Sequence, residues 1–542
     1  MREKVLKGLV AATAAAALVV PSVAQAAPPA ASTAANTEQL VVPKINWGSC
    51  GAEPGLKPFQ CATVEVPTDY DHPRGPTTTI ALTRLPASDP AHRIGTLFTN
   101  PGGPGGPGVD FVQQVGQYAY TPQVRAQFDI LGFDPRGVGK SDPATCFRTE
   151  AEEQAVLNTQ PAFPYTRAEE RAYTAWSVKV GLTCAATSGD KLAHMSTANV
   201  ARDMDLLRQS VGDDKLSYVG YSYGTYLGAT YAKLFPTKIR ALVLDGTLNP
   251  PWYSGSDGDR RPVGVRFRQG DGAAAAFAQF KAECKKAGPD KCSLARLGDP
   301  STVVENLFER LKTSPAVVTL PDGSTTTVTY QIAVAVGFEN MYDPAGWSAL
   351  ADMYSQIAVR GKSKAMRLKA PAALVEWSKH KEEYSSLAQG MQPCIETPPT
   401  GRPLAYPAYA DAADQAAPHF GRLRAWLGQP CEFVPIRDTD AFKGPWPNKV
   451  KEPVLVIGTR YDPATPYEAT RPYSDLYPDA RMLTIEGYGH TTLFKSTCAD
   501  ARITEYLTQL KAPADGSTCQ QDRKPFDPGS AAKKLTQEVV VH

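Results

Sequence analysis

The chain has 542 residues, of which 42% are hydrophobic and 21% are charged, so its composition is that of a globular protein with a large core. This length exceeds one ordinary small domain, but one large α/β domain with an insertion would fit it. The formal net charge is +2 without runs of basic residues, so we expect no nucleic-acid partner.

The first 26 residues have the pattern of a secretory signal peptide. Three basic residues accompany the apolar run 9–20, and Ala24-Gln25-Ala26 forms a small-residue cleavage site. The apolar run is too short to span a bilayer. Residues 27–40 are rich in Ala, Pro, Ser and Thr, which predicts a flexible leader or propeptide. We therefore expect a secreted, extracellular protein that has no contact with the membrane after cleavage.

β-prone and helix-prone segments alternate along the first half of the chain. After a β-rich start at 61–85, we expect strands at 95–99, 128–133, 215–219 and 241–244, with helices at 197–209 and 225–232. Such alternation predicts an α/β fold with a mostly parallel central sheet whose two faces are both covered.

Between residues 248 and 450 this alternation is interrupted. The segment contains helical patterns separated by Pro and Gly: 273–286, 302–312, 347–358 and 372–381. Strands resume at 453–457 and 482–485. We therefore predict a large, mainly helical cap at 248–450, inserted between two parts of a core at 41–247 and 451–520, with a C-terminal tail at 521–542.

The pentapeptide Gly220-Tyr221-Ser222-Tyr223-Gly224 lies between a predicted strand and a predicted helix. A strand, then Gly-x-Ser-x-Gly, then a helix is the context that a nucleophile elbow requires, in which a sharp turn holds the serine hydroxyl clear of the sheet. The flanking glycines leave room where the strand and helix backbones crowd together. We therefore predict that Ser222 is a nucleophile in an α/β-hydrolase fold.

A serine hydroxyl needs a base to take its proton, and His490 fits that role among the seven histidines. It follows the last predicted strand in the glycine-rich loop 487–491, where this fold places its base. For the carboxylate that orients the imidazole, the sequence offers two candidates. Asp462 follows the strand 453–457 and is favoured by chain order, while Asp245 ends an earlier strand, where some hydrolases keep the acid.

Catalysis of this kind also needs N–H donors for the tetrahedral oxyanion. We expect one from the main chain of Tyr223 and the other from Gly102 or Gly103, in the loop after an early strand. The same loop matches a dinucleotide-binding Gly-x-Gly-x-x-Gly pattern at 103–108. Its prolines remove N–H donors that a pyrophosphate would need, so we expect no cofactor.

The ten cysteines fall into neighbouring pairs along the chain. Disulfides are typical of exported proteins, but ten cysteines allow roughly 900 connectivities. Sequential pairing is the simplest prediction: Cys50–Cys61, Cys146–Cys184, Cys284–Cys292, Cys394–Cys431 and Cys498–Cys519. Zinc binding is the competing use, but neither Cys-x-x-Cys nor His-Glu-x-x-His occurs, so we expect no metal site.

With these residues, nearly the whole mature chain resembles the secreted bacterial tripeptidyl aminopeptidases, relatives of the proline iminopeptidases within the α/β-hydrolases. The resemblance rests on four motifs in combination: residues 100–105, 132–139, 220–228 and 462–466. The loop 100–105 is similar to the His-Gly-Gly-Pro-Gly oxyanion loop of the iminopeptidases, with Pro101 where they have histidine.

The resemblance implies a serine exopeptidase that works through an acyl-enzyme. It implies that the short peptides released from free N-termini are tripeptides. Cys394-Ile395-Glu396 is similar to a Cys-x-acidic pattern of the family, which implies that Glu396 binds the substrate's ammonium group; the alternative is a solvated surface glutamate. We expect peptides with free N-termini as partners and a monomer. Two other functions stay open: a secreted esterase or lipase, and a catalytically silent hydrolase-fold binding protein.

Overall fold

The computed structural model describes residues 40–319, 325–359, 366–367 and 386–527. The expected signal peptide, the leader up to residue 39, the helical pattern at 372–381 and residues 528–542 of the tail lie outside these ranges. The described residues belong to one compact unit.

A ten-stranded sheet forms the centre of the core, in the order β1-β2-β3-β5-β4-β6-β7-β11-β12-β13. Strands β1 to β3 pair antiparallel with one another and β3 pairs antiparallel with β5, whereas all the other pairs are parallel. The strands are β1 (Gly48–Ser49), β2 (Gln60–Pro67), β3 (Thr77–Leu85), β4 (Gly95–Asn100), β5 (Phe128–Phe133), β6 (Leu216–Tyr221), β7 (Ile239–Asp245), β11 (Val454–Tyr461), β12 (Ala480–Tyr488) and β13 (Ser517–Gln520).

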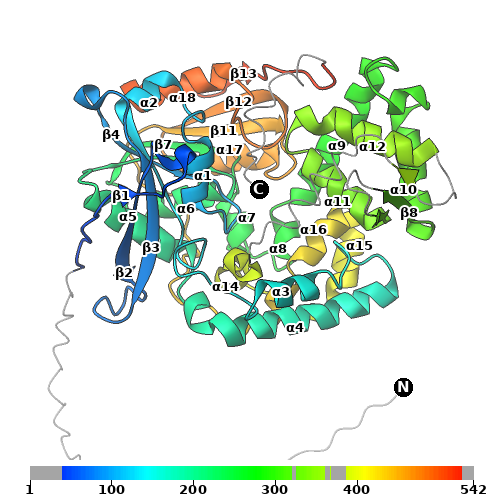
Figure 1. Ribbon diagram of the computed structural model, residues 1–542, viewed down its shortest axis with the longest axis horizontal. Coiled ribbons are helices and arrows are strands. Elements are labelled where there is room, and N and C mark those ends of the chain that lie inside the picture. The colour runs from blue at the N-terminus through cyan, green and yellow to red at the C-terminus, as the bar shows by residue number, and fades with distance from the viewer. Residues whose placement is uncertain (1–39, 320–324, 360–365, 368–385, 528–542) are drawn as a thin grey trace, which may run out of the picture. The chain divides into compact units, whose positions relative to one another are not determined.

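Helices cover both faces of this sheet (Figure 1). Neighbouring strand residues alternate between two hydrophobic clusters, since successive side chains of a strand point to opposite faces: Tyr218 packs in one cluster and Val219 in the other. Helices α5 and α6 contribute to the first cluster and α1, α2 and α18 to the second. Their bounds are α1 (Gly108–Val115), α2 (Pro122–Gln127), α5 (Thr197–Ser210), α6 (Tyr223–Leu234) and α18 (Thr497–Gln509), with α17 (Thr470–Ser474) on the first face.

After β7 the chain leaves the sheet and forms a mainly helical insertion with a hydrophobic cluster of its own, which includes Phe277, Phe308, Trp347 and Trp426. Its helices are α7 (Pro250–Ser254), α8 (Val263–Arg266), α9 (Gln269–Ala287), α10 (Pro300–Thr313), α11 (Tyr330–Asn340), α12 (Trp347–Val359), α14 (Gln392–Glu396), α15 (Tyr406–Ala416) and α16 (Phe420–Leu427). It also holds a small sheet that the sequence did not predict: β8 (Ala316–Thr319), β9 (Thr325–Val328) and β10 (Met366–Arg367).

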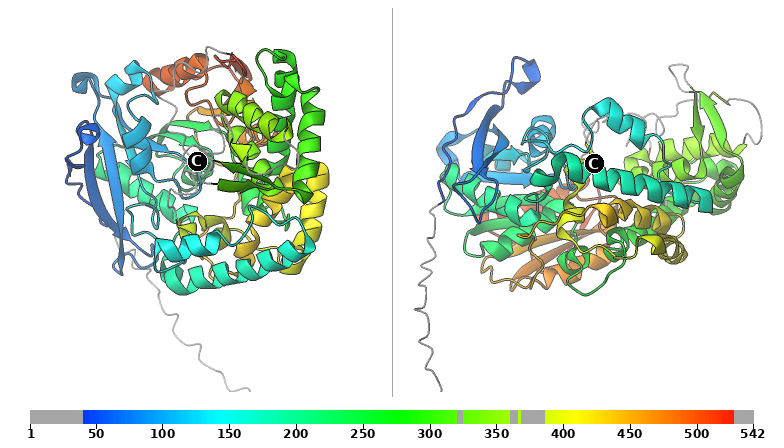
Figure 2. Two further views of the ribbon diagram at one scale, coloured as in Figure 1. Left: turned by 45° about the vertical axis from the view of Figure 1, so that its right-hand side comes forward. Right: turned by 90° about the horizontal axis from the view of Figure 1, so that it is seen from below.

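A second segment, between β5 and α5, packs against this insertion. It consists of α3 (Glu150–Leu157) and α4 (Arg167–Leu192), and α4 runs beside α15 and α16 in the views of Figures 1 and 2. The rings of Tyr173 and Trp426 meet with centroids 5.5 Å apart. Ser177 donates a hydrogen bond of 2.9 Å to Gln429. The sequence analysis assigned these two helices to the first part of the core, 41–247. In the structure they pack against the insertion.

Five disulfides join the ten cysteines with the pairings expected from their order. Cys394–Cys431 ties α14 to the segment after α16, and Cys498–Cys519 ties α18 to β13. In the part of the chain that the structure describes, no group of three or more His, Cys, Asp or Glu side chains is placed to hold a metal ion. None of the described helices combines the length and the apolar character that a membrane span requires.

Candidate active site

Ser222 occupies the sharp turn between β6 and α6, with φ 55° and ψ −125°. A positive φ is uncommon for a residue other than glycine and costs free energy, so the surrounding structure must enforce it. The Ser222 N–H donates to the carbonyl of Asp245 at 2.9 Å. The Thr225 N–H and hydroxyl donate to the Ser222 carbonyl at 2.8 and 2.6 Å. These bonds hold the turn that the sequence predicted as a nucleophile elbow.

Two glycines of the pentapeptide are required by close backbone contacts. A Cβ atom on Gly220 would lie 2.4 Å from the carbonyl oxygen of Gly224, and a Cβ on Gly224 would lie 2.8 Å from the carbonyl oxygen of Asn100. A larger residue at Gly220 would therefore push β6 and α6 apart, and a larger residue at Gly224 would push α6 away from the end of β4.

His490 and Asp462 meet at the carboxyl ends of β12 and β11. The imidazole Nδ1 lies 2.9 Å from each carboxylate oxygen of Asp462. The main-chain N–H groups of Ala464 and Thr465 donate to Asp462 Oδ1 at 2.8 Å, and the Thr465 hydroxyl donates to Oδ2 at 2.9 Å. Both side chains are buried, with Asp462 1% and His490 8% exposed. The carboxylate is therefore fixed by donors of its own loop while it orients the imidazole.

Asp245, the other candidate for the acid, has different partners. Its Oδ2 accepts hydrogen bonds from the N–H and the hydroxyl of Thr492 at 2.8 and 2.7 Å, and its Oδ1 has no hydrogen-bond partner among the described residues. Burial raises the pKa of Asp245 to about 6. The side chain of Asp245 thus anchors the His490 loop at Thr492. Its main-chain carbonyl anchors the elbow at Ser222.

Ser222 and His490 lie at the same end of the sheet. Gly246 follows Asp245, whose carbonyl accepts the Ser222 N–H. A Cβ atom on Gly246 would lie 3.1 Å from His490 Cε1. Ser222 lines a cavity together with Thr465, whose hydroxyl is 3.3 Å from His490 Nδ1. No hydrogen bond joins Ser222 to His490 in the described part of the chain. Such catalytic hydrogen bonds are often long without substrate and shorten when it binds.

The glycine-proline loop after β4 lies directly against the elbow. A Cβ atom on Gly102 would approach Ser222 Cβ to 2.8 Å and the main-chain nitrogen of Tyr223 to 3.0 Å. The Gly102 N–H donates to the Asn100 side chain at 3.0 Å, which occupies it, whereas Gly103 lines the cavity beside Ser222. Of the two expected glycine donors, the geometry therefore favours Gly103.

The cavity that contains Ser222 has a volume of about 470 Å³ and lies between the core and the insertion. Gly103, Ser222 and Thr465 lie on the core side. Helices α4, α7, α8, α14 and α16 contribute to the remaining wall, which is largely apolar or aromatic and includes Tyr173, Trp176, Tyr253, Val263, Pro393 and Leu427. A substrate at Ser222 would thus contact both the insertion and α4.

Glu396 is 3% exposed, which excludes the solvated surface glutamate that was the alternative. Its carboxylate accepts hydrogen bonds from the N–H and hydroxyl of Thr197 at 2.8 and 3.0 Å and from the Tyr253 hydroxyl at 3.1 Å. Burial raises the pKa of Glu396 to about 7. Glu396 is not one of the residues that line the cavity, but Tyr253 is, so the carboxylate lies one side chain behind the cavity wall.

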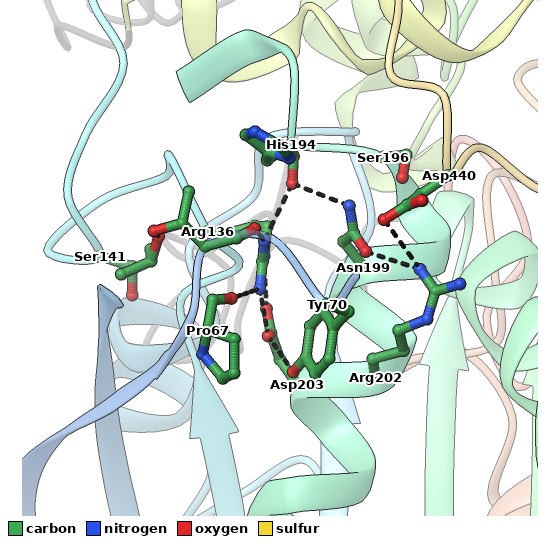
Figure 3. Close-up of polar contacts among 12 residues, drawn as sticks. Pro67, Tyr70, Arg136, Ser141, His194, Ser196, Asn199, Arg202, Asp203 and Asp440 are labelled. Carbon is green, nitrogen blue, oxygen red and sulfur yellow. Dashed lines mark hydrogen bonds and ion pairs between the residues drawn. The ribbon is translucent and has the colours of Figure 1, made fainter. Parts of the chain in front are cut away.

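A buried ion pair, which sequence reasoning missed, fixes helix α5 next to this site. Arg136 donates to the two carboxylate oxygens of Asp203 at 2.8 and 2.6 Å and to the carbonyls of Pro67, Thr68 and His194 (Figure 3). The only signal in the sequence was the Pro-Arg-Gly turn directly after the buried strand β5. Because Thr197 opens α5, this ion pair also positions the partner of Glu396.

Two family models match the chain: one described as "alpha/beta hydrolase fold" over residues 96–284, and one described as "TAP-like protein" over residues 417–519. The chain is 33% identical over 503 residues to the serine protease Hip1 of Mycobacterium tuberculosis, an alignment that covers 88% of this chain and 91% of that protein. The chain belongs to the TAP-like α/β-hydrolases. The family resemblance and the fold class expected from the sequence are confirmed.

Other TAP-like α/β-hydrolases have names of two kinds. The tripeptidyl aminopeptidase of Streptomyces lividans is 28% identical over 492 residues, with 89% of this chain and 87% of that protein covered. Carboxylesterase B of Mycobacterium tuberculosis is 30% identical over 496 residues, with 89% and 91% covered. Relatives of similar identity therefore include both a peptidase and a protein named as an esterase.

Proposed function

We propose that this protein is a secreted serine exopeptidase that releases tripeptides from the free N-termini of peptides and proteins. The names of two relatives, a serine protease and a tripeptidyl aminopeptidase, support a peptidase. The five disulfides support export, since such bonds persist in oxidising compartments.

In the proposed mechanism Ser222 attacks the scissile carbonyl while His490 takes the hydroxyl proton. Asp462 holds the imidazole with Nδ1 toward its carboxylate, so that Nε2 is free to act as the base. The N–H groups of Tyr223 and Gly103 stabilise the tetrahedral oxyanion. His490 then protonates the leaving amine, and a water molecule activated by the same imidazole hydrolyses the acyl-enzyme.

One observation carries the exopeptidase part of this proposal: Ser222 lines a cavity between the core and the insertion, and a buried carboxylate lies one hydrogen bond behind the wall of that cavity. No Lys or Arg side chain of the described residues forms an ion pair with Glu396. A buried charge without a counter-charge is costly, and the ammonium group of a substrate N-terminus would supply that counter-charge. An acetylated N-terminus is neutral and would supply no counter-charge. Its acetyl group would also need additional room beneath the insertion.

A graded set of fluorogenic amides tests the proposal: di-, tri- and tetrapeptides with identical sequences, each with a free and an acetylated N-terminus. We expect the free tripeptide to have the highest kcat/KM and acetylation to lower it by about 100-fold or more, the scale of losing one partner of a buried charge pair. Equal turnover of the free and acetylated peptides would contradict an exopeptidase.

The second candidate function is a secreted esterase, which the relative named carboxylesterase B favours. The same Ser-His-Asp arrangement cleaves esters as well as amides. Hydrolysis of short acyl p-nitrophenyl esters without any hydrolysis of the peptide amides would support the esterase and exclude the peptidase.

A further inference from the structure

Arg424 is a cationic side chain in the wall of the catalytic cavity, on helix α16 of the insertion. Packing fixes this helix tightly: a Cβ atom on Gly264 of α8 would lie 2.2 Å from the Arg424 carbonyl oxygen. Trp426, two residues further along α16, is fully buried. The main chain that carries Arg424 therefore has little freedom to move away from the cavity.

The guanidinium group of Arg424 lacks the partners that arginines normally have in this protein. Its Nε is buried and has no hydrogen-bond partner among the described residues, and the group contacts the ring of Phe338 at 5.2 Å. Arg422, on the same helix, by contrast forms ion pairs with Glu170 and Asp411. Among the described residues, Arg424 thus has a charged donor group that forms no ion pair and whose Nε has no hydrogen-bond partner.

Glu339 is an acidic neighbour of Arg424, and the charges of the two side chains interact. Burial raises the pKa of Glu339 to about 7, and the charge of Arg424 opposes that rise. Tyr342, whose ring lies 5.1 Å from that of His490, also interacts electrostatically with Arg424. Arg424 and Ser222 line the same cavity, and Tyr342 is a neighbour of both Arg424 and the catalytic imidazole.

We propose that Arg424 forms a subsite that binds a carboxylate of the substrate, so that the enzyme prefers peptides with Asp or Glu among the residues that it releases. This inference rests on the proposed exopeptidase function. A guanidinium group and a carboxylate match in shape and form two parallel hydrogen bonds. Because much of the surrounding wall is apolar, little water competes for the pair and the electrostatic preference for a carboxylate over a neutral amide is strengthened.

Binding of product tripeptides to the full-length Ser222→Ala variant tests the subsite without turnover. Isothermal titration calorimetry would compare Ala-Ala-Ala derivatives that carry Glu or its neutral isostere Gln at the first, second or third position. We expect Glu at one position to bind about 10-fold tighter than Gln, in line with a charge-assisted bidentate pair. The preference should disappear when Arg424→Met is added.

Arg268→Met provides the matched control. Arg268 is an exposed arginine that lines a neighbouring cavity of about 160 Å³ shared with Arg424, and it pairs with Asp271. This variant should keep the preference for Glu. Arg424→Lys keeps the charge without the planar fork and should retain a reduced preference, which provides the test if Arg424→Met does not fold.

The outcomes separate this inference from the proposed function. Binding of the Glu and Gln peptides with equal affinity at all three positions, or a preference that survives Arg424→Met, would overturn the subsite. A preference for Glu that depends on Arg424, in a wild-type protein that hydrolyses no peptide amide, would support the subsite and overturn the exopeptidase. Failure of every peptide to bind would overturn both.

Discussion

His490 Nδ1 lies 2.9 Å from both carboxylate oxygens of Asp462, and this pairing distinguishes Asp462 from Asp245. The carboxylate of Asp245 instead accepts hydrogen bonds from Thr492, in the loop that carries His490. One acid therefore contacts the imidazole, and the other supports the loop that carries it.

The first prediction follows from this difference. Asp462→Asn should lower kcat by about 10⁴-fold, because an amide favours the wrong imidazole tautomer. Asp245→Asn should cost much less, since it changes only the support of the loop. Steady-state kinetics on a free tripeptide amide measures both. If Asp245→Asn were inactive and Asp462→Asn nearly as active as the wild type, Asp245 at the end of β7 would be the catalytic acid.

Ser222→Ala should abolish activity and leave the fold intact, because only a hydroxyl is lost. Fluorophosphonate reagents should label the wild-type protein at Ser222 and not label the variant, while circular dichroism and the melting temperature stay close to wild type. Labelling of another residue, with activity surviving in the variant, would refute the elbow serine as nucleophile. Absence of labelling in the wild type would favour the silent binding protein.

Glu396→Gln should weaken hydrolysis of free-amine peptides far more than that of a small activated ester. We expect KM for the free tripeptide amide to rise by about 100-fold or more, on the scale of a lost buried charge pair, with p-nitrophenyl acetate hydrolysis nearly unchanged. Asp438→Asn is the matched control, since Asp438 accepts the Ser196 N–H at the same end of α5. If both variants lose activity on both substrates equally, Glu396 only supports the helix.

The pH dependence of KM provides a separate test of Glu396. Its pKa is raised from 4.5 to about 7 by burial, so the carboxylate is ionised only at neutral pH and above. As the pH rises through about 7, KM for free-amine peptides should therefore fall, while KM for the ester stays constant. A KM that is flat between pH 6 and 8, or that rises, would contradict an ionised anchor.

The stability of the fold should decrease as the pH rises, although substrate binding should improve. A carboxyl group whose pKa is higher in the folded state contributes stability that is fully present below its unfolded pKa and is lost as the pH rises through the folded pKa. For Glu396 that window runs from 4.5 to about 7, and the loss is about 3 kcal/mol at most. The melting temperature of Glu396→Gln relative to wild type should therefore be higher at pH 8 than at pH 5. A difference independent of pH would contradict this.

Much of the core could be predicted from local sequence. The strand and helix around Ser222 match β6 and α6, because hydrophobic patterning and the glycine-flanked turn act over a few residues. The expected acid and base lie in contact because Asp462 and His490 follow β11 and β12, which pair in parallel and end together. Of the disulfides expected from cysteine order, Cys284–Cys292 and Cys498–Cys519 join partners within the same or adjoining elements.

Contacts between distant segments decided the rest. The position of Glu396 depends on Thr197, 199 residues earlier in the chain, and the choice of Gly103 over Gly102 depends on a single hydrogen bond to Asn100. Among the described residues, the lack of a hydrogen-bond partner for Arg424 Nε likewise depends on which elements pack around α16. Local patterns specify which elements form, because they depend on neighbouring residues alone. The packing of those elements determines which polar groups find partners and which remain available to a substrate.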